Sequence, residues 1–314
     1  MNPTQNWRCS LGALEQLPEL QAYQDAPAQM AAGAPGKRGH LSMAFEMRRG
    51  RSILSHLRRQ SPLLVQQALY WDEAMPQLPI CMMLSVGGGT LQGDRLSIDV
   101  DVADGACAHV TTQGASRIQA MDANCAVQAV NLSVGAGAYL EYLPDALIPY
   151  RQSRYASQTH ICLHPEGSLL LSEMVMAGRH HHGAGECFAY ELLSLSTRVF
   201  RPDGRAVFAE KLLITPLLHA PAQASVMHDQ QVFGTLFILT PPDVAQRILA
   251  RARPLCRFDQ APYAGVSELP GQAGLMCRIV GREAESVRQQ MRGFWQLARE
   301  EATGHGLPSE FAWR

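Results

Sequence analysis

The sequence predicts a mainly β protein, with a β-helical or stacked-sheet body and a small C-terminal α/β module. Between Pro79 and Pro216, short apolar runs recur with glycine-containing turns between them, and no helical periodicity separates them. After about residue 220 the pattern changes to short strands that alternate with two stretches of helical periodicity. The first observation argues against a doubly wound α/β fold, which needs helices between successive strands.

The N-terminal segment differs in composition from the rest of the chain. Residues 1–38 are rich in Ala, Gln, Gly and Pro, and the run AAGAPGKRG closes them. We therefore expect a poorly ordered extension over these residues. A β-rich body is expected over residues 39–220, and a β-α-β-β-α segment packed on it over residues 221–314. At the start of the body, RRGR at residues 48–51 lies between two apolar runs, which is typical of a hairpin.

A glycine-rich stretch in the body, SVGGGTLQGDRLSIDVDV at residues 85–102, has the first half of the spacing of a phosphate-binding loop. Such a loop needs Lys and then Ser or Thr after its last glycine, and it opens a helix. Here Asp94 and Arg95 follow Gly93, and apolar residues then alternate with polar ones from Leu96 to Val102, which predicts a strand. We therefore exclude nucleotide binding, and we expect the glycines to form a sharp turn that delivers Asp94, facing the interior, to the start of this strand.

The C-terminal segment contains five expected elements in the order β-α-β-β-α. Apolar runs at residues 233–240, 265–269 and 274–281 predict strands. A proline opens the first helical stretch, residues 241–252, and the second, residues 281–301, places apolar residues at intervals of three and four.

Composition excludes several classes of protein. The chain has 314 residues, 46% of them hydrophobic, which is enough for a sizeable core. A net charge of −1 gives no basic excess, so we do not expect nucleic acid as a partner. The N-terminus lacks a basic region followed by an apolar run, and no apolar stretch reaches the ~20 residues of a membrane span. We expect a cytoplasmic protein whose eight cysteines are reduced and that has no membrane partner.

Several long stretches resemble one known family. The string GGGTLQGDRLSIDVDVADGACAHVTTQGASRI, at residues 87–118, is similar to the urease accessory protein family called UreD or UreH. The similarity continues through VGAGAYLEYLPDALIPYRQSRY at 134–155, LLLSEMVMAGRHHHGAGECF at 169–188 and GRAVFAEKLLI at 204–214. It covers roughly residues 40–300 in the family's order. One departure is Val86, which stands where the family usually has proline before its glycines.

The resemblance implies a function that is not enzymatic. Family members bind urease apoprotein and act with UreF and with the GTPase UreG, to which UreE delivers nickel. The assembly helps Ni²⁺ and a CO₂-derived carbamate reach the buried active site of urease. The resemblance also implies a β-helical body with a water-filled tunnel for the metal. We thus expect urease structural subunits and UreF-like and UreG-like proteins as partners, with transient Ni²⁺ and no tightly bound cofactor.

Four polar positions of the implied tunnel follow from the resemblance: Asp94, Ser116, Glu173 and Glu210. Glu173 and Glu210 also attract attention by themselves, because each is a lone acid in an apolar strand-like run. A carboxylate in a core strand costs several kcal/mol unless it is paired or hydrated. Carboxylates with water between them suit transient contact with Ni²⁺.

A structural explanation of these acids stays open beside the functional one. Each acid can form a salt bridge inside the protein, with Arg95, Arg117 or Lys211 as candidates, or it can face outward on an alternating strand. In that case the protein is a structural β-scaffold with incidental acids.

Three consecutive histidines, His180, His181 and His182, form a second candidate metal site. The resembling family has a loop here, commonly without a histidine triplet. Neighbouring side chains on a strand point to opposite faces, so three adjacent histidines cannot all face one ion there. We consider a solvent-exposed loop and an auxiliary contribution to nickel binding.

A hydrolase is the remaining alternative. It would use Ser116 with His109 and Asp94, but the sequence lacks the G-x-S-x-G turn of many serine hydrolases. It also lacks the H-E-x-x-H spacing of a zinc protease.

Overall fold

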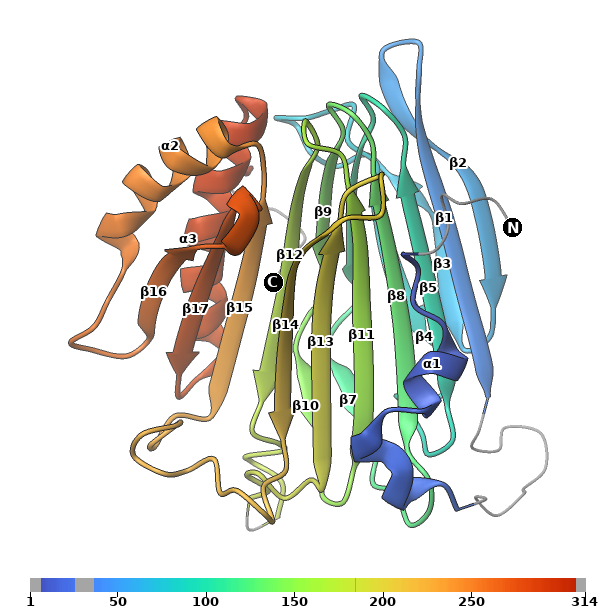
Figure 1. The fold of residues 1–314 in the computed structure, drawn as a ribbon, viewed down its shortest axis with the longest axis vertical. Helices are drawn as coiled ribbons and strands as arrows, with labels where there is room; N and C mark the ends of the chain where they lie inside the picture. The colour runs from blue at the N-terminus through green and yellow to red at the C-terminus, as the bar shows by residue number, and fades with distance from the viewer. Residues whose placement is uncertain (1–6, 26–36, 184, 309–314) are drawn as a thin grey trace.

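The computed structural model describes residues 7–25, 37–183 and 185–308. Within these residues the chain is mainly β, as the sequence predicts, and its strands form two mixed sheets (Figure 1). From edge to edge, the seven-stranded sheet contains β14 (Ala206–Ile214), β13 (Leu192–Phe200), β11 (Arg154–Leu163), β8 (Ala126–Val134), β5 (Arg95–Val102), β1 (Arg38–Arg48) and β2 (Arg51–Gln60).

The second sheet has ten strands within the described ranges. Its main path contains β16 (Tyr263–Glu268), β17 (Leu275–Gly281), β15 (Val232–Leu239), β12 (Ser168–Met176), β9 (Tyr139–Leu143), β6 (Cys107–Thr112), β4 (Ile80–Ser85) and β3 (Leu63–Leu69). Two short strands lie off this path, β7 (Ser116–Ile118) and β10 (Leu147–Pro149). The helical elements are α1 (Leu11–Glu15), η2 (Pro18–Tyr23), α2 (Pro242–Ala252), η3 (Arg253–Leu255), η4 (Pro270–Gln272) and α3 (Ala284–Thr303).

The middle of the chain passes back and forth between the two sheets. From β5 the long strands alternate, with β6, β9 and β12 in the ten-stranded sheet and β8, β11 and β13 in the other. Successive strands within each sheet are parallel neighbours. Parallel strands are usually buried on both faces, and the continuous burial of β6 and β9 agrees with this rule.

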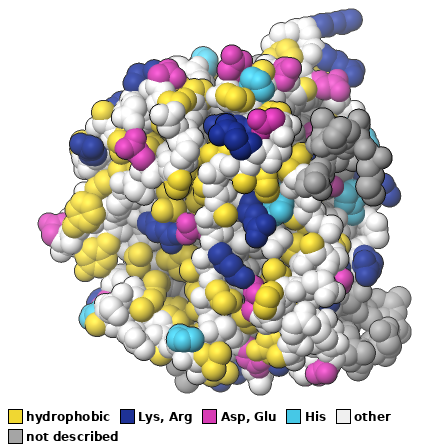
Figure 2. Space-filling model, in the orientation of Figure 1, with side chains coloured by type: hydrophobic (Ala, Val, Ile, Leu, Met, Phe, Trp, Pro, Cys, Tyr) yellow, Lys and Arg dark blue, Asp and Glu magenta, His cyan; other side chains and the backbone are white. Residues whose placement is uncertain are grey.

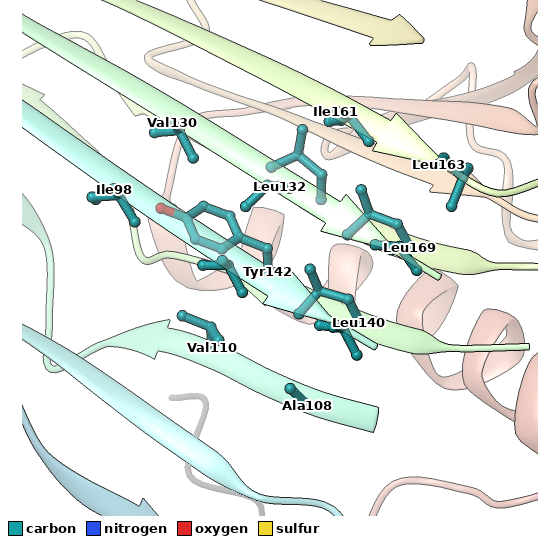
Figure 3. Packing of buried hydrophobic residues seen from close by; sticks show 14 of the residues in the cluster. Ile98, Ala108, Val110, Val130, Leu132, Leu140, Tyr142, Ile161, Leu163 and Leu169 are labelled. Carbon is teal, nitrogen blue, oxygen red and sulfur yellow. The ribbon is translucent and has the colours of Figure 1, made fainter. Parts of the chain in front are cut away.

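The main hydrophobic core fills the space between the sheets. In β5 the buried residues are Leu96, Ile98, Val100 and Val102, so the predicted alternation is confirmed. Figure 3 shows Ile98 and Val130 of one sheet near Tyr142 of the other, with Leu132, Leu140 and Leu169 farther along the same layer.

The predicted hairpin at RRGR is confirmed. β1 and β2 are antiparallel, and the turn residues Arg49 and Gly50 have φ angles of 52° and 77°. Two consecutive residues with positive φ are the signature of a type I′ turn, whose twist suits a two-residue hairpin.

The prediction of a poorly ordered N-terminal extension is wrong for residues 7–25. There α1 and η2 place Leu14 and Leu20, both fully buried, against Val127 and Ala156 of the seven-stranded sheet. Burying these two leucines contributes about 3–6 kcal/mol toward the conformational entropy that the segment loses on ordering. Residues 1–6 and 26–36 of the predicted extension lie outside the described residues.

The C-terminal segment contains β15, α2, β16, β17 and α3 in that order. β15 pairs antiparallel with β12, so these strands continue the ten-stranded sheet. The helix α3 lies along β15 and β17, and apolar residues such as Met291 and Phe294 join the core on the outer face of that sheet (Figure 1). No helix among the described residues combines the length and apolar content required to cross a membrane.

A fully buried charged network connects α3 to the strands beneath it. Glu141 of β9 accepts hydrogen bonds at Oε1 from the Tyr139 hydroxyl and from Trp295 Nε1, each 2.7 Å long. Its Oε2 lies 2.7 Å from His109 Nδ1. Arg299 lies 3.6 Å from Glu141 and also pairs with Asp72, whose Oδ1 accepts the backbone N–H groups of residues 74 and 75.

The charges in this network support one another. Burial by itself raises the pKa of Glu141, but the hydrogen bond with His109 and the charge of Arg299 outweigh burial and hold that pKa below its usual value. The acids around Arg299 likewise keep its pKa above the usual value despite burial. Both groups are therefore ionised at neutral pH.

We predict that Arg299→Met destabilises the fold strongly. The variant keeps most of the side-chain volume but leaves Asp72 and Glu141 buried without their cation, which costs about 3–5 kcal/mol. The matched control is Arg247→Met, because Arg247 pairs with Asp243 and Glu301 at an exposed site worth at most about 1 kcal/mol. Urea unfolding followed by circular dichroism measures both, and equal losses in the two variants would contradict the prediction.

Candidate functional site

A cavity of about 570 Å³ lies between the two sheets. Residues of β5, β8, β11 and β13 line it from one side, and residues of β4, β6, β9 and β12 from the other. Its apolar wall includes Ile98, Val130 and Tyr142, so it continues from the core layer of Figure 3. Its polar lining includes Ser116, Gln128, Ser157, Thr159, Ser172 and Glu173.

Short polar side chains account for the unfilled space. On β11, Ser157 and Thr159 point inward at alternate positions, and on β12 Ser172 and Glu173 also reach the cavity. Packed sheets lie about 10 Å apart, and this gap is normally filled by large apolar residues from both sides. Serine and threonine do not fill it, and a polar space of this size can hold ordered water.

The glycine-rich loop forms part of the cavity wall where the cavity reaches the surface. Gly88 is exposed and lines the cavity together with Gly89 and Thr90. Gly89 has a φ of 127°, and a Cβ atom there would lie 2.5 Å from the carbonyl oxygen of Arg117. The Thr90 N–H donates to the same oxygen over 2.8 Å. Glycine is thus required at position 89 by close backbone approach, which agrees with the predicted sharp turn.

Of the acids on the cavity wall, Glu173 has the pKa that is raised most strongly. Its half-buried carboxylate accepts a hydrogen bond of 3.0 Å from the Thr197 hydroxyl of β13 across the gap between the sheets. Burial, together with the negative charge of Glu210, raises the pKa of Glu173 to about 7, although Thr197 and Arg278 oppose the rise. At neutral pH this carboxyl is therefore close to half protonated.

The structure separates the four predicted tunnel positions into two pairs. Ser116 and Glu173 line the same cavity, whereas Asp94 and Glu210 are not among its lining residues. Glu210 of β14 forms an ion pair with Arg278 of β17, and Thr197 faces it in register on β13. Glu210 therefore acts on the cavity through its charge near Glu173.

Asp94 is buried as predicted, but backbone amide groups surround its carboxylate. Oδ2 accepts the Leu91 N–H over 2.8 Å, and Oδ1 accepts the Lys37 N–H over 3.2 Å. Burial raises its pKa, and these two hydrogen bonds oppose the rise. Its observed contacts hold the loop that ends the glycine-rich stretch against the start of β1, and a role in metal transfer stays a prediction.

Two of the three salt-bridge partners suggested by the sequence, Arg95 and Lys211, pair with other acids. Arg95 pairs with Glu15 of α1 over 2.6 Å, and Lys211 pairs with Glu19 of η2 over 2.7 Å. Both bonds attach the N-terminal segment to the seven-stranded sheet. Glu210 has a salt bridge, as the structural explanation proposed, but its cation is Arg278.

The three histidines lie on an exposed loop between β12 and β13, as the first alternative predicted. His180, His181 and His182 line a second pocket of about 550 Å³, together with residues of β10 and of the start of α3. Among the described residues, no group of three or more His, Cys, Asp or Glu side chains is arranged to hold a metal ion. A ligand role for the triplet stays a prediction.

The hydrolase alternative gains no support from the geometry. The carboxylate beside His109 is Glu141, not Asp94, and it belongs to the buried network under α3. Asp94 is engaged by backbone amides. The sequence analysis missed Glu141 as a structural centre, although it is a lone acid in the apolar run AYLEYL and carries the same signal that pointed to Glu173.

We predict that Glu173→Gln removes a stability loss that develops as pH rises. The pKa of Glu173 is higher in the folded protein than in the unfolded chain, so ionising this carboxyl lowers the free energy of unfolding. The protonated form's contribution to stability is fully present below about pH 4.5 and is lost as the pH rises through about 7. The variant should therefore gain stability relative to the unmodified protein between pH 5 and pH 8, on the order of 1–3 kcal/mol.

Urea unfolding of both proteins at pH 5 and pH 8 measures this difference. Glu73→Gln at an exposed position is the control, and it should show the same pH dependence as the unmodified protein. A Glu173→Gln curve parallel to the control would show that this carboxyl has an ordinary pKa.

Comparison with known proteins agrees with the family resemblance. Residues 37–314 match the family described as UreD urease accessory protein. The chain is 53% identical to urease accessory protein UreD 3 of Methylorubrum populi and 52% identical to UreD 2 of Methylorubrum extorquens, each over 97% of this chain and 98% of the relative. It is 43% identical to UreD 2 of Brucella suis over 94% of this chain and 98% of that protein. The chain therefore belongs to the UreD family of urease accessory proteins.

Proposed function

We propose that this protein is a non-catalytic maturation factor that binds urease apoprotein with UreF-like and UreG-like partners and gives Ni²⁺ a passage toward the urease active site. The observation that carries the proposal is the polar cavity between the sheets, with Glu173 on its wall. Family membership supplies the connection to urease.

The lining of the cavity suits a hydrated cation in transit. Hydroxyl groups of Ser116, Ser157 and Thr159 can exchange hydrogen bonds with the water around an ion without holding the ion itself. Two carboxylates line the cavity, Glu173 and Asp145, and Asp145 is paired with Arg288. Within the described residues they form no group of three or more ligands that would make a tight chelate. Weak, water-mediated contacts favour release, which a conduit needs and a storage site does not.

Exposed apolar residues support binding to other proteins. Leu213 lies near the end of β14, and Leu217, Leu218 and Val226 follow it along the chain; Leu217 and Leu218 are each more than three-quarters exposed. Large exposed apolar side chains are typical of interaction surfaces. On the face shown in Figure 2, acidic and basic side chains are interspersed with apolar ones, which suits a protein partner.

The competing function, a structural scaffold with incidental acids, predicts the same complexes, but in it the cavity is not needed for urease activation. The first experiment is therefore co-expression with urease structural subunits and UreF- and UreG-type partners, followed by affinity purification. Recovery of urease with this chain supports the accessory role, and its absence with a soluble, folded chain would overturn the role itself.

We predict that narrowing the cavity lowers nickel-dependent urease activation without abolishing partner binding. Thr159→Phe places a ring in the cavity from β11, whereas Thr159→Val keeps the shape of the side chain and leaves the cavity open. Glu173→Ala removes the carboxylate and should also lower activation. Urease activity per purified complex is the measurement, with partner recovery and unfolding midpoints determined for each variant.

The conduit is contradicted if Thr159→Phe and Glu173→Ala activate urease as fully as Thr159→Val does. That result, combined with normal partner recovery, would favour a scaffold with incidental acids. The predicted roles of Asp94 and Glu210 can be tested in the same assay with alanine variants.

A further inference from the structure

The pocket under the histidine loop is adjacent to the inner cavity. Ile148 of β10 lines both spaces, and Asp145 of the cavity pairs with Arg288 of the pocket. Met176, at the end of β12, lines the pocket two residues after Met174 lines the cavity. The histidine side of the pocket is therefore next to the proposed passage.

The loop between β12 and β13 brings two metal-ligating atoms together. The Phe188 N–H donates to the Ala177 carbonyl over 2.7 Å, and the Glu186 N–H donates to the Arg179 carbonyl over 3.1 Å, which closes the loop. His180 Nδ1 then lies 3.4 Å from Cys187 Sγ.

This separation matches two ligands of one ion. Bonds to a divalent metal of about 2.0–2.1 Å for nitrogen and about 2.3 Å for sulfur place cis ligands roughly 3.1–3.6 Å apart. The His181 ring centroid lies 4.6 Å from that of His180, so a further imidazole is close to the pair. His180, His181 and Cys187 are all exposed, and an ion can reach them and leave them from solvent.

The arginines around the pocket are engaged in ion pairs. Three arginines line it, and each forms an ion pair with at least one carboxylate: Arg179 with Glu186, Arg282 with Asp229, and Arg288 with Glu285 and Asp145. Glu283 also lines the pocket. The charges of the three arginines are thus offset by ion pairs, although only Glu283 and Glu285 of the carboxylates line the pocket itself.

We propose that His180 and Cys187 bind a divalent transition-metal ion as a pair of protein ligands, with water completing its coordination. Imidazole and thiolate are suitable ligands for Ni²⁺, and binding replaces the thiol proton of Cys187, which passes to solvent. The binding site stands on its own geometry. Its role as a loading point for the passage rests on the proposed function.

The test is titration of the purified full chain with Ni²⁺ alone, followed by near-ultraviolet absorption. We expect a saturable thiolate-to-nickel charge-transfer band. Cys187→Ser should abolish the band, and His180→Ala should weaken nickel affinity by at least about tenfold. The controls are Cys256→Ser, a partly exposed cysteine elsewhere, and His219→Ala, an exposed histidine whose Nδ1 lies 3.4 Å from the Thr215 hydroxyl. Both controls should keep the band and the affinity.

A chain that gives no band, or a band that persists in Cys187→Ser, would overturn the site and leave the accessory function untouched. The same variants in the urease activation assay separate the two proposals. If Thr159→Phe shows a normal nickel band and still activates urease, the passage is rejected and the metal site is kept.

Discussion

The spacing between the two sheets constrains the rest of this structure. The chain crosses from one sheet to the other at almost every strand between β5 and β13, so neither sheet can move far from its partner. Sheets that pack face to face lie about 10 Å apart, and side chains from both must fill the gap. Where Leu132, Leu140 and Leu169 face inward the gap is filled. Where Ser157, Thr159 and Glu173 face inward, the same spacing leaves a cavity with polar groups on its wall.

A second constraint fixes the C-terminal helix. Trp295 and Arg299 of α3 bind Glu141, and Arg299 also binds Asp72, so one turn of the helix is attached to two separate parts of the chain. Buried charges of this kind are costly to separate, which gives the helix one defined position on the sheet. Because this network occupies the outer face of the ten-stranded sheet, it leaves the space between the sheets to the cavity.

Local patterns in the sequence predicted local structure well. The alternation from Leu96 to Val102 and the RRGR turn need only neighbouring residues, and both predictions are confirmed. The N-terminal prediction was wrong because it relied on the composition of the segment and gave no weight to Leu14 and Leu20. These two leucines are buried against strands that lie more than a hundred residues later in the sequence. Contacts between residues that are far apart in the sequence could not be predicted either. Glu173 meets Thr197 and Asp72 meets Arg299, and no periodicity relates such distant positions.

Two glutamates on the neighbouring strands β9 and β12 have pKa values shifted in opposite directions by their surroundings. Glu141 has an arginine, an imidazole and two further donors around it, and its lowered pKa keeps it ionised and fully satisfied. Glu173 has one hydroxyl donor and a nearby like charge, and its pKa near 7 leaves part of its binding capacity unused. A divalent cation arriving beside Glu173 would favour the ionised form and displace a proton, and the returning proton would favour release. The opposed pKa values thus agree with the observed role of Glu141 in holding the fold and with the proposed contact of Glu173 with a passing ion.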